Sequence, residues 1–251
     1  MPGEGYLGAH GAGEFPVNDV RYYKRDLWEV ENLKHAEPHF RLRKVARVVD
    51  RITHGRPCDL LDVGCGPAAL ARLMPPGVSY HGIDIAIHEP APNLIEMDIL
   101  DEKISFCDKK FDVIVAQGIF EYVGMFQSQK LAEIAGLLKE HGKFIVTYQN
   151  FTHRKPQIYK LYSNVQSPGD FRADLSRFFA IERCFAVSHN WNHGQPVRPF
   201  MKAAQAHLNV RIPVLSPILA VDYLYICSAR GPGDDRPAAS GPARHAGVPA
   251  A

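Results

Sequence analysis

Short apolar runs and amphipathic segments alternate through the middle of the chain. Runs of apolar side chains predict strands at 59–63, 78–85, 93–99, 111–117 and 143–149. Apolar residues at helical spacing predict helices at 40–52 and 126–140, with a shorter helix at 68–73. Gly142 follows the second helix, where a left-handed residue would end it. Because strands and helices alternate, we expect a parallel sheet with helices on both faces.

The final third of the chain shows a different pattern. Residues 168–179 are predicted to form a helix that begins at the sequence SPGD. Two strand patterns follow, IERCFAVSH at 181–189 and AVDYLYICSA at 220–229, and they predict an antiparallel edge on an otherwise parallel sheet. The segments near 151–167 and 190–217 follow strand ends, where an open α/β sheet builds its substrate site. We expect these two insertions to form a cap over the substrate.

The two ends of the chain lack a core pattern. Residues 1–34 begin with a glycine-rich stretch, which we expect to be mobile. Tyr22, Tyr23 and Trp28 follow this stretch. Residues 231–251 are rich in glycine, proline and alanine, which predicts a disordered tail. We therefore expect one α/β domain over residues 35–230.

Basic side chains occupy much of the predicted helix 40–52 outside its apolar face. They are Arg41, Arg43, Lys44, Arg47 and Arg51. We interpret them as a solvated face, and the alternative is that some of them bind a substrate.

Composition removes several classes of function. The formal net charge of +2 over 251 residues is too close to neutral to indicate nucleic acid or an anionic membrane as a partner. The cysteines number five and form no C-x-x-C pair, so we expect reduced thiols rather than disulfides or a zinc site. The sequence shows no signal-peptide pattern and no apolar run of about 18 residues. We expect a cytoplasmic protein, as a monomer or a homodimer, that does not associate with membranes.

The stretch DLLDVGCGPAAL at 59–70 combines a strand, a glycine turn and a predicted helix start, the usual seat of a nucleotide-like cofactor. A dinucleotide loop reads Gly-x-Gly-x-x-Gly, whereas this chain has Gly64, Gly66 and then Ala69. Asp62 stands two residues before the first glycine. Its carboxylate would repel a pyrophosphate but attract the α-ammonium group of S-adenosylmethionine.

Two further acids follow at strand ends. Asp84 is placed to accept hydrogen bonds from ribose hydroxyls, although this position suits NAD equally well. Asp98 could accept a hydrogen bond from the adenine amino group. Ile85 and Ile99 are the apolar neighbours that could enclose the adenine ring.

The motifs LLDVGCGPAAL, YHGIDIA, NLIEMDIL, FDVIVAQGIFEYV and LLKEHGKFIVTY occur in this order over about residues 40–150. Together they resemble the successive motifs of the class I S-adenosylmethionine (SAM)-dependent methyltransferases, in their small-molecule branch. The resemblance implies an α/β fold with a Rossmann-like, seven-stranded, mostly parallel sheet, helices on both faces and an antiparallel C-terminal strand pair. It also implies SAM as cofactor and a set of cofactor contacts: Asp62, Gly64, Cys65, Gly66, Asp84, Ile85, Asp98, Ile99, Gln117 and Gly118.

Candidate catalytic residues lie after the fourth and fifth strands. Many family members carry Glu-His after strand four, where this chain has Glu121 and Tyr122, so the role of that histidine is vacant. Glu121 could bind the acceptor or be structural, and Tyr122 could act in catalysis or in packing. His153 is a candidate base, with a surface histidine as the alternative. His189 and His193 could contact the acceptor, and we expect no metal site.

We expect a SAM-dependent methyltransferase that acts on a hydroxyl of a small molecule such as a sugar or a secondary metabolite. Transfer to nitrogen or carbon ranks below transfer to oxygen. A basic groove and an Asn-Pro-Pro-Tyr-type motif, which would indicate other acceptors, are both missing from the sequence. Two other classes stay open, a nicotinamide oxidoreductase and a non-catalytic SAM-binding protein. The aromatic residues of 1–34 would then form a lid over the cofactor or pack at the edge of the domain.

Overall fold

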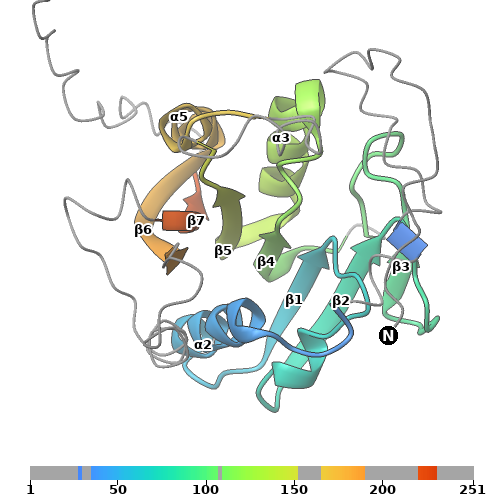
Figure 1. The fold of residues 1–251 in the computed structure, drawn as a ribbon. Helices are drawn as coiled ribbons and strands as arrows, with labels where there is room; N and C mark the ends of the chain where they lie inside the picture. Colours follow the sequence, from blue (N-terminus) through green and yellow to red (C-terminus); the bar gives the residue numbers. More distant parts are fainter. Residues whose placement is uncertain (1–27, 30–34, 107–108, 152–164, 190–219, 231–251) are drawn as a thin grey trace, which may run out of the picture.

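A seven-stranded sheet forms the centre of the protein in a computed structural model, which describes residues 28–29, 35–106, 109–151, 165–189 and 220–230. The strands are β1 (Cys58–Val63), β2 (Val78–Asp84), β3 (Leu94–Glu96), β4 (Phe111–Gln117), β5 (Leu138–Gln149), β6 (Phe179–His189) and β7 (Ala220–Ala229). Their order across the sheet is β3-β2-β1-β4-β5-β7-β6 (Figure 1). This arrangement confirms the fold class that the motifs imply.

β7 runs against both of its neighbours, β5 and β6, while the strands from β3 to β5 pair in parallel. β1 lies between β2 and β4, so the chain reverses its direction of travel across the sheet at β1. Ligands of open α/β sheets bind at this reversal, outside the carboxyl ends of the strands. Because β7 is inverted, its first residues reach the same edge, where Asp222 pairs with Gln149 of β5.

Helices cover both faces of the sheet, as predicted (Figure 1). One face packs on α2 (Phe40–Thr53), with Val45 and Val49 fully buried against that side of the core. The other face packs on α3 (Gln127–Leu137) and α5 (Pro168–Phe178). Two 3₁₀ turns are also present, η3 (Ala71–Leu73) and η4 (Gly124–Phe126). In the described residues, no helix has the length and apolar character needed to cross a membrane.

Local sequence explains where α5 begins. Ser167 caps the helix by accepting a hydrogen bond from the Asp170 N–H at 3.1 Å, and Pro168 occupies the first turn. Both features are typical of helix N-termini, because the first N–H groups of a helix lack partners within it. The prediction that SPGD starts a helix is confirmed.

Two details of the predicted secondary structure are wrong. Residues 68–73 form no α-helix, since Ala68 has a φ of +50° and only the 3₁₀ turn η3 follows before the next strand. Gly142 does not end a helix either: α3 stops at Leu137 and Gly142 lies within β5. A Cβ at Gly142 would lie 2.9 Å from the Phe111 carbonyl oxygen, so close packing of backbones explains this glycine.

Candidate cofactor and acceptor site

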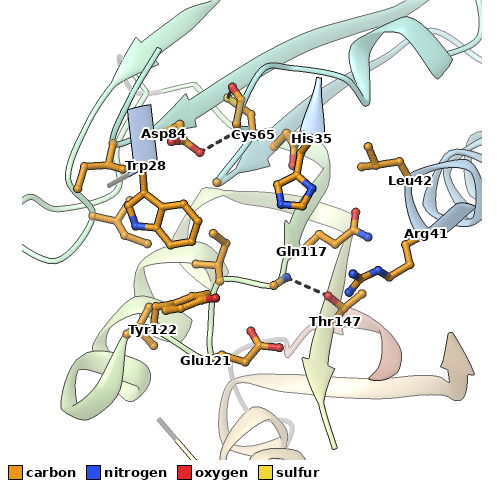
Figure 2. Close-up of a pocket in the computed structure, with 18 of the residues that line it drawn as sticks. Trp28, His35, Arg41, Leu42, Cys65, Asp84, Gln117, Glu121, Tyr122 and Thr147 are labelled. Carbon is orange, nitrogen blue, oxygen red and sulfur yellow. Dashed lines mark hydrogen bonds between the residues drawn. The ribbon is translucent and has the colours of Figure 1, made fainter. Parts of the chain in front are cut away.

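A pocket of about 380 Å³ opens at the carboxyl ends of the parallel strands (Figure 2). Every cofactor candidate from the sequence lines it, together with both candidates after strand four: Asp62, Gly64, Cys65, Gly66, Asp84, Ile85, Asp98, Ile99, Gln117, Gly118, Glu121 and Tyr122. Residues separated by up to about sixty positions in the chain therefore share one cavity, while the cofactor roles of these side chains stay predictions.

The glycine loop after β1 is held by the neighbouring strand. The N–H groups of Gly64 and Cys65 donate to the Ile83 carbonyl at 2.8 and 3.1 Å. Gly64 has a φ of +74°, and a Cβ there would lie 1.9 Å from the Ile119 side chain, so only glycine fits. Asp84 secures the next residue by accepting from the Gly66 N–H at 2.7 Å. These hydrogen bonds connect the loop to the end of β2.

Asp62 is almost completely buried at the end of β1. Its Oδ2 accepts a hydrogen bond from the Tyr80 hydroxyl at 2.7 Å. The pKa of Asp62 is raised to about 7, chiefly by burial; the hydrogen bond from Tyr80 opposes this shift, and the negative charge of Asp84 contributes to it. A cationic group that approaches this carboxylate would favour its ionised form.

Asp98 follows β3 and orders the next turn of chain. Its Oδ1 accepts from the Leu100 N–H at 2.9 Å. Apolar side chains of Ile85, Met97 and Ile99 line the pocket around it. An acceptor oxygen beside apolar walls suits a flat heterocycle that carries an amino group.

Glu121 occupies the opposite end of the pocket. Its Oε1 accepts from the Gln149 N–H at 2.8 Å, whereas Oε2 is buried without a hydrogen-bond partner among the described residues. Burial raises the pKa of Glu121 to about 7, and the charge of Asp222 adds to the shift while Arg41 opposes it. One oxygen of this buried carboxyl group therefore has unused hydrogen-bonding capacity among the described residues.

Arg41 and Asp222 form an ion pair at 3.5 Å beside this carboxyl group. Asp222 is nearly buried, and the Arg41 side chain is about two-fifths exposed. Neither residue is among the site residues predicted from the sequence. Arg41 lies on a helix face predicted to be solvated, whereas Asp222 carries a signal of a polar site, because it is an acid within the apolar run AVDYLYICSA.

Other pocket residues were also missed. Thr147 and Gln149 are polar positions at the end of β5, and their place at the carboxyl edge of the sheet could have identified them. Thr147 accepts from the Gly118 N–H at 3.0 Å (Figure 2). His35 and His39 line the pocket as well, and burial lowers the pKa of His39 to about 4.

Tyr122 packs against Trp28 from the N-terminal segment, with ring centroids 5.3 Å apart and planes at 86°. Figure 2 shows the two rings together on one side of the pocket, away from Arg41 and Thr147. Both residues line the cavity. His153, His193, Tyr22 and Tyr23 lie outside the described residues, as does the side chain of His189.

The strand order, the glycine loop after β1 and the acids after β2 and β3 define the class I, Rossmann-like methyltransferase fold, whose cofactor is SAM. A family model described as "Methyltransferase domain" matches residues 38–179, which is more than half of the chain. The chain belongs to this methyltransferase family, and the resemblance of its motifs to the class I SAM-dependent methyltransferases is confirmed. A search of curated proteins finds no match.

Solved structures of several methyltransferases share this fold. A SAM-dependent methyltransferase from Clostridium acetobutylicum has a TM-score of 0.53 at 13% identity, over 80% of this chain and 96% of that chain. The plantazolicin methyltransferase BpumL, solved with a triazolic desmethylPZN analog and S-adenosylhomocysteine (SAH), gives 0.53 at 14%, over 85% and 98%. The Burkholderia thailandensis 1,6-didemethyltoxoflavin-N1-methyltransferase gives 0.50 at 14%, over 76% and 79%. Identities this low establish the fold alone.

Proposed function

We propose that this methyltransferase transfers the methyl group of SAM to a hydroxyl of a small molecule, with Glu121 as the general base. The observation that carries the proposal is that Glu121 lines the pocket and that its Oε2 is buried without a hydrogen-bond partner among the described residues. A hydroxyl acceptor must lose a proton as it is methylated, so it needs a base within reach. A carboxyl group with a pKa of about 7 is suited to that task near neutral pH.

The cofactor half of the site would be formed by the loop after β1 and the two following strand ends. When bound, SAM supplies an electrophilic methyl group on a sulfonium centre. Asp62 would accept from the α-ammonium group and Asp84 from the ribose hydroxyls. Asp84 already accepts hydrogen bonds from the Gly66 and Ala86 N–H groups, and a carboxylate oxygen can accept more than one hydrogen bond. Asp98, Ile85 and Ile99 would surround the adenine.

The acceptor would lie beside Gln117, Gly118 and Glu121. The acceptor oxygen attacks the methyl carbon as the carbon–sulfur bond breaks, and the hydroxyl proton passes to Glu121. The leaving thioether is neutral, so no acid is required. Gly118 leaves open space, since a Cβ there would contact nothing within 4 Å. The residues of the chain act mainly by alignment of the two reactants.

A second candidate function is methyl transfer to an amine. Among the described residues, Glu121 and Asp222 place two buried carboxyl groups at this end of the pocket, against the one guanidinium of Arg41. Such an excess of acid favours neutral or cationic acceptors over anionic ones. A protonated amine would also need the base that Glu121 provides.

The N-terminal segment is proposed as a lid. The contact between Trp28 and Tyr122 places one aromatic residue of this segment at the pocket, which supports a role in covering the ligands. The acceptor cap is likewise proposed for the insertions near 151–167 and 190–217, because Gln149 shortly before the first and Asp222 shortly after the second line the pocket.

The test incubates the protein with SAM and matched sets of small alcohols, amines and carboxylic acids, and detects by mass spectrometry the gain of one methylene unit. We expect products among alcohols, or among amines for the second candidate. Glu121→Gln should reduce kcat by about 100-fold or more, the usual contribution of a general base. Asp174→Asn, which changes a carboxyl group elsewhere, serves as the control.

The pH dependence gives a second readout. Activity should rise with pH as Glu121 loses its proton around pH 7 and should then level off. This rise should be absent from the residual activity of Glu121→Gln. Methylation confined to carboxylic acids, or full activity of Glu121→Gln, would contradict the proposal.

A further inference from the structure

Tyr80 contacts the buried carboxylate of Asp62 from the neighbouring strand β2. Its hydroxyl donates to Asp62 Oδ2 at 2.7 Å, and both side chains are at least nine-tenths buried. This is the one hydrogen bond to the Asp62 carboxylate that the described part of the chain contains. A buried carboxylate without a donor would be strongly disfavoured, so this bond matters for its charge.

The register of the sheet explains why Tyr80 supplies the bond. Tyr80 pairs with Leu60 and Gly82 pairs with Asp62, so Tyr80 and Asp62 project from the same face of the sheet, one pleat apart. Gly82 has no side chain, and a Cβ there would lie 2.7 Å from Cys65 Sγ. The direct neighbour of Asp62 therefore offers no polar group, and the longer tyrosine reaches across.

We propose that Tyr80 is a positioning residue for cofactor binding, which holds Asp62 in place and leaves its other oxygen to accept from the α-ammonium group of SAM. This inference rests on the proposed cofactor role of Asp62. It adds a residue outside the lining of the pocket to the set that determines cofactor affinity.

The surroundings of Asp62 favour its neutral form, and the hydroxyl of Tyr80 favours its ionised form. The groups that face Asp62 are Tyr80, Asp84 and the Cys65 thiol. Burial and the Asp84 carboxylate both raise the pKa of Asp62, and the Tyr80 hydroxyl is the group that lowers it. The pKa of the Cys65 thiol is raised by burial, so this thiol stays neutral and brings no charge. Without the hydroxyl, Asp62 would be protonated to a higher pH and would lose its attraction for an ammonium group.

The experiment compares two ligands of the whole protein by calorimetry between about pH 6 and 9. SAH carries the α-ammonium group, and 5′-methylthioadenosine has the same adenosine and thioether without the amino-acid part. Tyr80→Phe should lower the affinity for SAH by about tenfold at pH 7, the loss expected for a hydrogen bond to a charged group. In the native protein the affinity for SAH should increase with pH as Asp62 ionises. In Tyr80→Phe this increase should occur at a higher pH. The amine of the ligand titrates equally in every variant, so it cancels from the comparison.

Two further variants complete the design. Tyr225→Phe removes a buried hydroxyl that donates to the Pro168 carbonyl, away from the pocket, and should leave SAH affinity unchanged. Asp62→Asn should lower the affinity for SAH. Adding Tyr80→Phe to this variant should cause no further loss of affinity, because the two residues act through one contact.

The outcomes separate this inference from the proposed function. The role of Tyr80 would be overturned if Tyr80→Phe lowered the affinities for SAH and 5′-methylthioadenosine equally, or if it left the affinity for SAH unchanged. Unchanged SAH affinity in Asp62→Asn would remove Asp62 from the site, and the inference with it. Failure of the native protein to bind SAH would instead contradict the assignment of the whole pocket. Retained binding of 5′-methylthioadenosine with selective loss of SAH supports the inference.

Discussion

Glu121 is buried, and one of its oxygens has no hydrogen-bond partner among the described residues. Its burial suits the proposed role as a base near neutral pH, but the same burial reduces the stability of the folded protein. Its raised pKa means that the folded protein holds this proton more tightly than the unfolded chain does. The carboxyl group is therefore neutral in both states below about pH 4.5. Between there and about pH 7 ionisation favours the unfolded chain, so Glu121 reduces stability as the pH rises.

Glu121→Gln should accordingly stabilise the protein at pH 8 by about 3 kcal/mol and have little effect at pH 4, since one pKa unit corresponds to about 1.4 kcal/mol. The glutamine can still accept from the Gln149 N–H. Chemical denaturation at both pH values measures the change. Equal stability of the two proteins at pH 8 would show that the buried carboxyl group carries no such cost.

Glu133→Gln is the matched control of opposite sign. Burial would raise the pKa of Glu133, but hydrogen bonds from the Ile104 N–H and from Lys130 outweigh it and lower the pKa. Its ionised form therefore stabilises the protein above the unfolded pKa and loses this effect in acid. Replacement should reduce stability at pH 8 and have less effect at pH 4.

Basic residues of α2 show why the sequence alone misplaced part of the site. Arg43 and Arg51 are exposed, as a solvated face requires. Lys44 is buried, however, and donates to the carbonyls of Ala186 and Val187 near the end of β6, while Arg41 reaches Asp222. Helical spacing identifies the apolar stripe, but the partners of its flanking residues depend on strands about 140 to 180 positions away in the chain.

At the scale of elements, β5 begins with a tight contact against the start of β4. Gly142→Ala would place a Cβ 2.9 to 3.0 Å from the Phe111 and Lys139 carbonyl oxygens, which are backbone atoms that cannot move aside easily. We expect a loss of about 1 to 3 kcal/mol, the usual cost of overpacking. Thermal or chemical unfolding measures it.

Gly136→Ala provides the control in the same region. Gly136 lies in α3, where an added Cβ would meet nothing within 4 Å. Alanine favours helix over glycine by about 1 kcal/mol, so this change should be neutral or stabilising. If both substitutions had the same effect, close backbone packing would not explain Gly142.

The strands and most of the cofactor candidates could be predicted because each depends on a local pattern. An apolar run followed by an acid or a glycine marks the carboxyl end of a strand, and parallel pairing brings these ends together. Gly142 and residues 68–73 could not be predicted in this way. The same glycine suits a helix end or a crowded strand, and only the approach of Phe111 distinguishes them.

The pocket is lined by residues of the glycine loop, of the ends of β2 and β3 and of the start of β7. A ligand in it would therefore contact parts of the protein that are distant in the sequence. SAH at about 100 times its dissociation constant should raise the melting temperature by about 5 to 10 °C, because only the folded state binds it. NADH at the same concentration should produce no shift. A shift with NADH alone would instead support a nicotinamide oxidoreductase, and thermal denaturation followed by circular dichroism measures both.

The inversion of β7 has a consequence for how this protein could diversify. His189, the last residue of β6, pairs with Ala220, the first of β7, so the segment between them leaves and re-enters the sheet at one point beside the pocket. Its length and sequence can change while the hydrogen-bonded frame stays constant. If this segment forms the proposed acceptor cap, exchange of residues 190–219 between relatives should change the acceptor preference and leave cofactor binding unaltered.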